Sequence, residues 1–267
     1  MKLALVQMES TADKKKNLEH SLELARQAIK ESPRVIIFPE YQMLLPDFSD
    51  PDSVRKNAEP LEGPFTSAFK DLAKKSRTYL MINIVEQNIY SLKPFNTSVL
   101  IDDMGIIVGK YRKAHLFDAY SFHEGNAFEP GRDRLHPLEI PDVSFGTQIC
   151  YDLRFPEPSR MLRLMGSGIL TYQAGWFSGE RKLDTWRTLL RSRAMENAAF
   201  VLGIAQCGSR FTGHSIAISP YGDVLAEAGD GEQILQVDID LSLITKYSND
   251  VPVIRQRRLD LYDVSGL

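Results

Sequence analysis

The chain has 267 residues, of which 43% are hydrophobic and 25% charged, a composition typical of a globular protein with a substantial core. Its formal net charge of −3 gives no general affinity for polyanions, so nucleic acid is not expected as a partner. No stretch approaches the ~18 apolar residues of a membrane span and no signal peptide begins the chain, so we expect a cytoplasmic protein without a membrane partner.

The first half is expected to alternate strands and helices and then to end in a run of strands. Leu18, Leu22, Ala25 and Ile29 recur at helical spacing, which predicts an amphipathic helix. Short apolar runs bounded by turn residues predict strands. The expected elements are a strand 3–6, a helix 11–30, a strand 35–38, a helix 65–75, and strands 79–85, 97–101 and 106–115.

The second half shows much the same order. The expected elements are a strand 143–150, a helix 156–165, a strand 169–172, a helix 181–197, and strands 200–205, 215–219, 224–228 and 234–237. Each half would form a sheet with helices on one face, and its other face would need covering. We therefore predict an α/β fold, a four-layer α-β-β-α sandwich of two mixed sheets. Because no Gly/Ser/Pro linker separates the halves, a single domain over 1–267 is favoured over two independent α/β domains.

Three polar residues lie at the carboxyl ends of expected strands. Glu40 follows the strand 35–38, Lys113 lies near the end of the strand 106–115, and Cys150 ends the strand 143–150. Catalytic groups in α/β sheets tend to lie just beyond such ends. Because three strand ends can converge in space, these residues are candidates for one site although they are far apart in the chain.

Cys150 is the stronger of two candidate nucleophiles. A free cysteine is most often a small buried apolar residue, and two cysteines make neither a disulfide framework nor a metal cluster. Cys150 lies between an apolar strand and a helix opened by Pro156, which resembles the strand–turn–helix arrangement of exposed nucleophiles. The amides of Cys150 and Tyr151 at such a turn could bind an oxyanion. Cys207 has no helix after it and is expected to be structural or pocket-lining.

A catalytic thiol needs a group that accepts its proton. His115 is the best candidate among five histidines, because it lies two residues from Lys113 and both side chains would share one face of a strand. A poorly solvated carboxylate can serve instead, and Glu40 follows a fully apolar strand. Lys113 would then hold a positive charge near the thiol and bind the oxyanion. The alternatives are an ion pair for Glu40 and a surface position for Lys113.

Three segments surround the candidate residues: VIIFPEYQML around Glu40, GKYRKAHLFD around Lys113 and TQICYDLRFPEPSR around Cys150. Together they resemble the three catalytic blocks of the nitrilase superfamily, the carbon–nitrogen hydrolases, in the same order. Further stretches match as well, including RAMEN at 193–197 and the tail VPVIRQRRLDLY. The resemblance covers nearly the whole chain. It implies an α-β-β-α sandwich and a catalytic triad of Glu40, Lys113 and Cys150.

The resemblance also implies supporting groups around the triad. A second glutamate of the superfamily follows the lysine block; Glu124 has the matching spacing to Gly131, whereas Glu129 is expected to be a solvated loop residue. The backbone of Tyr151 would contact the oxyanion. The mechanism implied needs neither a metal nor an organic cofactor.

CYDLRFPE and RRLDLY resemble the omega-amidase-like branch, which hydrolyses the distal amide of small dicarboxylic monoamides. The implied substrate is therefore a small amide that carries a carboxylate. Arg154 is a candidate for binding that carboxylate, because a guanidinium grips a carboxylate through two hydrogen bonds; the alternative is an ion pair with Asp152 or Glu157. Trp176 could line the pocket, and core packing is its alternative.

The segment TYQAGWFSGERKLDTW differs from many relatives at Gln173, Gly175 and Asp184, and it borders the pocket in the superfamily. The substrate can therefore differ from theirs. Hydrolysis of N-carbamoyl compounds or nitriles on the same triad is the first alternative. A Cys–His hydrolase that uses His115 and a non-catalytic ligand-binding protein of the same fold are the others.

Relatives in the superfamily commonly form dimers through helices near the active-site face and through a C-terminal arm. The arm would comprise residues 250–267 here, and its apolar residues Val251, Val253 and Ile254 could pack on a partner. The resemblance therefore implies a homodimer or a higher homo-oligomer.

Overall fold

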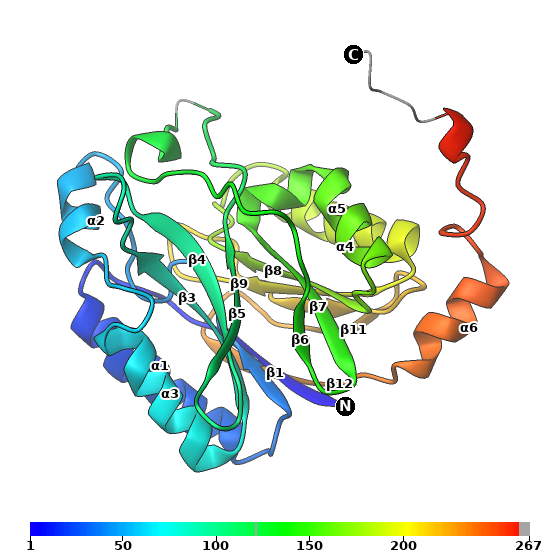
Figure 1. The fold of residues 1–267 in the computed structure, drawn as a ribbon, viewed down its shortest axis with the longest axis horizontal. Coiled ribbons are helices and arrows are strands. Elements are labelled where there is room, and N and C mark those ends of the chain that lie inside the picture. The colour runs from blue at the N-terminus through cyan, green and yellow to red at the C-terminus, as the bar shows by residue number, and fades with distance from the viewer. Residues whose placement is uncertain (121, 262–267) are drawn as a thin grey trace.

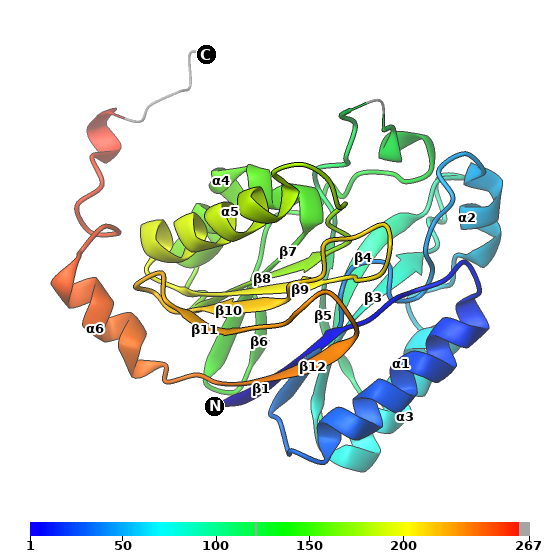
Figure 2. The ribbon, with the colours of Figure 1, turned by 180° about the vertical axis from the view of Figure 1, so that it is seen from behind.

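Two six-stranded mixed sheets pack face to face in the computed structural model, which describes residues 1–120 and 122–261 (Figure 1). Helices cover the outer face of each sheet, and Figure 2 shows the four layers from behind. The predicted α-β-β-α sandwich is thereby confirmed. Among the described residues, no helix is long and apolar enough to cross a bilayer.

The first sheet has the strand order β12-β1-β2-β3-β4-β5. Its strands are β1 (Lys2–Gln7), β2 (Val35–Ile37), β3 (Tyr79–Glu86), β4 (Phe95–Ile101), β5 (Ile107–Arg112) and β12 (Gln233–Asp238). The helices of this half are α1 (Lys14–Ile29), α2 (Pro51–Asn57) and α3 (Pro64–Ser76). Helices α1 and α3 lie on the outer face of the sheet (Figure 1).

The second sheet has the strand order β11-β10-β9-β8-β7-β6. Its strands are β6 (Leu138–Ile140), β7 (Val143–Ile149), β8 (Ile169–Ala174), β9 (Phe200–Ala205), β10 (Ile216–Ile218) and β11 (Val224–Glu227). The helices of this half are α4 (Pro156–Leu164), α5 (Lys182–Asn197) and α6 (Ser242–Asp250). The short 3₁₀ turns in the described part of the chain are η1 (Glu124–Asn126), η2 (Cys150–Arg154) and η3 (Leu259–Leu261).

Alternation along the buried strands explains the layers. In β1, Leu3 and Leu5 point into the core between the sheets, whereas Ala4 and Val6 point toward α1 and α3. Successive side chains of a strand face opposite sides, so a strand that is apolar at every position needs cover on both. The other sheet supplies one cover and the helices supply the second.

One part of the predicted topology is wrong. Strand β12 was expected to stay with the second half, but it pairs antiparallel with β1, with Leu3 opposite Val237 and Leu5 opposite Leu235. The physical reason is that Leu235 and Val237 join the core between the sheets beside Leu3 and Leu5. The two halves of the chain are therefore joined by strand pairing as well as by packing.

Two helices were not predicted. Helix α2 has an Asp50 side chain that accepts a hydrogen bond from the Ser53 amide and has Pro51 at its first turn, both of which are helix-start signals. Helix α6 precedes the arm predicted for 250–267 and extends away from the sheets (Figure 1). Residues 262–267 of that arm, including the end of the tail motif, lie outside the described residues.

Candidate active site

The carboxyl ends of β2 and β5 lie at one edge of the first sheet. Strand β2 is parallel to β3, and two antiparallel pairings give β5 the direction of β3. Glu40 follows β2 and Lys113 follows β5, so the predicted convergence of these two strand ends occurs. Cys150 follows β7 in the facing sheet and completes the cluster.

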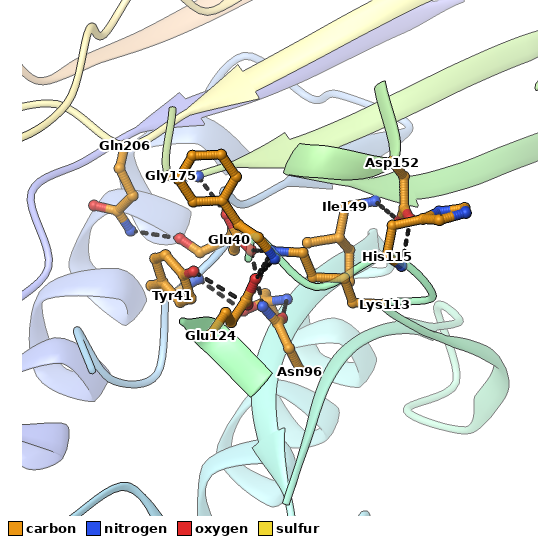
Figure 3. A network of polar contacts seen from close by, with 12 residues as sticks. Glu40, Tyr41, Asn96, Lys113, His115, Glu124, Ile149, Asp152, Gly175 and Gln206 are labelled. Atoms are coloured by element: carbon orange, nitrogen blue, oxygen red, sulfur yellow. Dashed lines mark hydrogen bonds and ion pairs between the residues drawn. The ribbon is translucent and has the colours of Figure 1, made fainter. Parts of the chain in front are cut away.

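Glu40 is completely buried and fully hydrogen-bonded. Its Oε1 accepts from Asn96 Nδ2 at 2.8 Å and from Lys113 Nζ at 2.8 Å. Its Oε2 accepts from the backbone amide of Gly175 at 2.6 Å. These donors fix the carboxylate in one orientation, and Figure 3 shows it at the centre of the cluster.

Lys113 is 1% exposed and lies between two carboxylates. Its Nζ donates to Glu40 and, at 2.9 and 2.7 Å, to both oxygens of Glu124. Burial lowers the pKa of Lys113, but the charges of Glu124 and Glu40 outweigh burial and hold it above its ordinary value. The ammonium group therefore stays charged, which suits it to stabilise an anion and not to shuttle a proton.

Glu124 begins the turn η1 and is completely buried. Besides Lys113, it accepts hydrogen bonds from the Phe117 amide at 2.7 Å and from the Tyr41 hydroxyl at 3.3 Å. Burial and the neighbouring Glu40 charge raise its pKa, although Lys113 opposes them. The structure thus places Glu124 in the cluster, whereas Glu129 lies nearer the surface and pairs with Arg132.

Cys150 is the first residue of η2 and has a positive φ of 46°. The left-handed region is strained for a residue with a side chain, and such strain is concentrated at functional sites. Burial and the charge of Glu40 raise the pKa of the Cys150 thiol well above its usual value, and Lys113 lowers it in part. The sulfur therefore rests as a protonated thiol beside a carboxylate.

Asp152 holds the Cys150 turn in place. Its Oδ2 accepts from the Ile149 amide at 2.9 Å and from the Tyr111 hydroxyl at 2.8 Å. Its Oδ1 accepts from the His115 amide at 3.0 Å and lies 2.7 Å from His115 Nδ1. One buried carboxylate thus joins the turn after β7 to the segment after β5, which carries Lys113.

The expectation that Lys113 and His115 share one face of a strand is wrong. Strand β5 ends at Arg112, so both residues lie beyond it and their side chains diverge. Figure 3 shows His115 grouped with Asp152, apart from Glu40. The His115 ring also stacks on Phe155 with a centroid separation of 3.8 Å. The charged groups that act most strongly on the Cys150 thiol are carboxylates and a lysine, which disfavours the Cys–His alternative.

A pocket opens onto the Cys150 side chain and is also lined by Lys113 and Gly175. Aromatic side chains form much of its wall: Tyr41, Phe117, Tyr151, Trp176 and Phe177. Tyr151 thus lines the pocket directly after the candidate nucleophile. A small, largely aromatic cavity with few convergent polar groups is typical of a binding site for a small molecule.

Arg154 and Trp176 both line this pocket. The Arg154 guanidinium lies 5.1 Å from the Trp176 ring centroid. Asp152 is fully engaged elsewhere, and no ion pair joins Arg154 to Asp152, to Glu157 or to any other described residue. Trp176 lines the pocket and also packs in the core, because its ring centroid lies 5.4 Å from that of Trp186.

Three site residues were not identified from the sequence. Asn96 orients Glu40, Tyr41 contacts Glu124, and the Gly175 amide reaches Glu40. Gly175 was noted only as a departure from relatives; a Cβ there would lie 2.7 Å from the Tyr41 ring. Tyr41 has a φ of 61°, a left-handed backbone conformation that no pattern in the sequence predicts.

Comparisons with known proteins agree with this architecture. The deaminated glutathione amidase of Bos taurus is 32% identical over 278 residues, covering 99% of this chain and 84% of that protein. Omega-amidase NIT3 of Saccharomyces cerevisiae is 32% identical over 283 residues, covering 98% and 94%. The crystal structure of Saccharomyces cerevisiae Nit3, described as a member of branch 10 of the nitrilase superfamily, superposes with a TM-score of 0.87 at 29% identity over 97% of this chain and 96% of that one.

A second solved structure, the C. elegans NitFhit protein, gives a TM-score of 0.89 at 28% identity and covers 98% of this chain and 66% of that one. The family model described as carbon-nitrogen hydrolase matches residues 2–249. That match spans both sheets and every member of the buried cluster. The chain therefore belongs to the carbon–nitrogen hydrolase family, within the nitrilase superfamily.

Proposed function

We propose that this protein hydrolyses the amide of a small, carboxylate-bearing substrate through a thioester on Cys150 and releases ammonia. The observation that carries the proposal is the buried cluster of Glu40, Lys113 and Cys150, of which Lys113 and Cys150 line a small pocket. Two of the proteins described above are named as amidases, one of them as an omega-amidase, which supports amide hydrolysis.

The acylation step follows from the geometry of the cluster. Glu40 accepts the Cys150 proton, and the sulfur forms a bond to the amide carbon while the carbonyl π electrons move to oxygen. The Lys113 ammonium and the Tyr151 amide stabilise that oxyanion. Glu40 then returns the proton to the nitrogen, the carbon–nitrogen bond breaks, and ammonia leaves a thioester.

Deacylation reuses the same carboxylate. A water molecule gives a proton to Glu40 and its oxygen bonds to the thioester carbon, again with the oxyanion beside Lys113. The carbon–sulfur bond then breaks, and the proton returns from Glu40 to Cys150. Glu124 keeps Lys113 oriented and compensates its charge throughout. The net reaction consumes one water and yields a carboxylic acid and ammonia.

Arg154 is proposed to bind the carboxylate of the substrate. It lines the pocket with no ion pair to a described residue, so a carboxylate would find its donors available. Trp176 supports the guanidinium from the ring face. The Arg154→Met variant should therefore raise KM for a carboxylate-bearing amide while leaving kcat nearly constant.

Ammonia release from a panel of omega-amides, neutral amides, carbamoyl amino acids and nitriles tests the function. We expect the highest kcat/KM for omega-amides and loss of activity in Cys150→Ala. Turnover that survives this substitution would contradict the assignment. Ureido substrates release carbon dioxide as well as ammonia, so product analysis separates that alternative. Thiol labelling is a poor test of catalysis here, because the raised pKa of Cys150 slows alkylation of the resting enzyme.

Assembly, domain boundaries and location form a second part of the proposal. We propose one domain over 1–267 with 250–267 as an arm, supported by the pairing of β12 with β1. A cytoplasmic homodimer is supported by two free thiols and by apolar side chains exposed on the described part of the arm, such as Leu259 and Leu261. Light scattering of the purified chain should give twice the monomer mass.

A further inference from the structure

Two cations in the pocket wall have no carboxylate partner in residues 1–120 and 122–261. Among the described residues, the positively charged side chains that line the pocket are Lys113, Arg154 and Lys182. Lys113 is compensated by its ion pairs with two buried glutamates. Arg154 and Lys182 form no such pair with a described residue, which leaves two uncompensated positive charges in a wall that is otherwise mainly aromatic.

Aromatic side chains hold both cations without neutralising them. Trp176 carries the Arg154 guanidinium over its ring, and its indole Nε1 donates to the Lys182 carbonyl at 2.9 Å. The Lys182 ammonium lies 4.4 Å from the ring centroid of Tyr120 and 5.6 Å from that of Phe117. A ring face attracts a cation but accepts none of its hydrogen bonds in the ordinary sense. Both side chains therefore keep donors for a bound anion.

The number of charges has a consequence for the ligand. A partly buried charge without an ion partner is unfavourable, and an anionic ligand relieves that cost. A substrate with one carboxylate would satisfy Arg154 and leave Lys182 unpaired. A substrate with two carboxylates would satisfy both cations, and no carboxylate is found among the described residues of the pocket lining to repel it.

We propose that Lys182 acts with Arg154 to select substrates that carry two carboxylates in addition to the amide. This inference rests on the proposed function, in which Arg154 alone binds the single carboxylate of an omega-amide, and it adds Lys182 as a specificity-determining residue. The acyl group transferred to Cys150 then bears two negative charges.

Binding to the Cys150→Ala variant tests the selection without turnover. Isothermal titration calorimetry compares glutaramate with two dianionic versions, which carry a second carboxylate either directly on C3 or on a two-carbon arm at C3. We expect at least one dianion to bind about tenfold tighter than glutaramate, as one charge-assisted hydrogen bond contributes. Lys182→Met in the same background should remove that preference, and Lys182→Arg should restore most of it.

Arg181→Met is the matched control. Arg181 is adjacent in sequence, 84% exposed at its side chain, and paired with Glu180 outside the pocket lining. Arg181→Met removes one positive charge, as Lys182→Met does. If the preference for the dianion over glutaramate falls equally in both variants, that preference reflects the overall electrostatic field of the protein, and the inference is overturned. Equal affinity for all three ligands, a preference that survives Lys182→Met, or no binding would overturn it as well. Ammonia release by the unmodified enzyme is measured separately, so failure of the proposed function remains distinguishable.

Discussion

Replacing Glu124 by glutamine removes one negative charge from the buried cluster and keeps the shape of the side chain. In the native protein, Oε1 accepts from Tyr41 and Lys113, and Oε2 accepts from Lys113 and Phe117. A glutamine can keep the Oε2 contacts with its carbonyl and turn its amide nitrogen toward the Tyr41 oxygen. It then loses one contact to Lys113, because two donors face each other there.

The size of the effect follows from that single lost contact. A hydrogen bond to a charged group contributes about 1.5–3 kcal/mol. If the free energy of this hydrogen bond is lost entirely from the transition state that contains the oxyanion, kcat/KM falls by roughly 10- to 150-fold, with most of the change in kcat. The charge of Glu124 also raises the pKa of the Cys150 thiol. Its removal therefore lowers that pKa, so alkylation of the thiol should begin at a lower pH than in the native protein.

Steady-state ammonia release and the pH dependence of iodoacetamide labelling measure the two consequences. Glu129→Gln is the matched control, since Glu129 lies close in sequence but pairs with Arg132 outside the cluster. We expect this control to retain native kinetics and a native labelling profile. Activity of Glu124→Gln within threefold of native, together with an unchanged labelling profile, would refute the placement of Glu124 in the reaction.

Gly175→Ala should reduce kcat at least tenfold, because its Cβ would lie 2.7 Å from the Tyr41 ring and displace the amide that holds the Glu40 carboxylate; ammonia release measures this. Cys207→Ala should keep native kcat and lose about 1 kcal/mol in urea unfolding, since Cys207 is buried but does not line the pocket; loss of activity would contradict this. Burial raises the pKa of Glu86, but hydrogen bonds from Arg112 and others lower it overall. The Glu86 carboxylate therefore contributes stability above the unfolded-state pKa of ~4.3, and this contribution is lost as the pH falls through the lower folded-state pKa. Glu86→Gln should therefore make the free energy of unfolding less dependent on pH in the acid range.

The residues that the sequence could place are those that follow buried strands. Glu40, Lys113 and Cys150 each come after an apolar run, and the direction of a strand decides at which edge its last residue lies. Glu124 was chosen by its resemblance to a motif, and the structure brings it against Lys113. The sandwich itself followed from apolar runs that needed cover on two faces.

The rest depended on contacts between distant segments. Asn96 and Gly175 reach Glu40 from β4 and from the end of β8, and neither position carries a local signal for that role. Lys113 and His115 were misplaced relative to each other because β5 ends before them, where the alternation of a strand no longer applies. The sequence of β12 does not distinguish pairing with β11 from pairing with β1, because the edges of both strands offer free backbone hydrogen-bonding groups.

The pairing of β1 with β12 also sets the order in which the molecule can assemble. Strand β1 lies between β2 and β12, so its hydrogen bonds on one side wait for a segment from near the other end of the chain. Contacts of such long sequence separation form slowly, because loop closure must precede them. Until Gln233–Asp238 is synthesised, β1 presents an open edge of the kind that pairs with other chains. Folding and aggregation therefore compete during that interval, and variants that weaken β12 should first reveal themselves as a lower yield of folded protein.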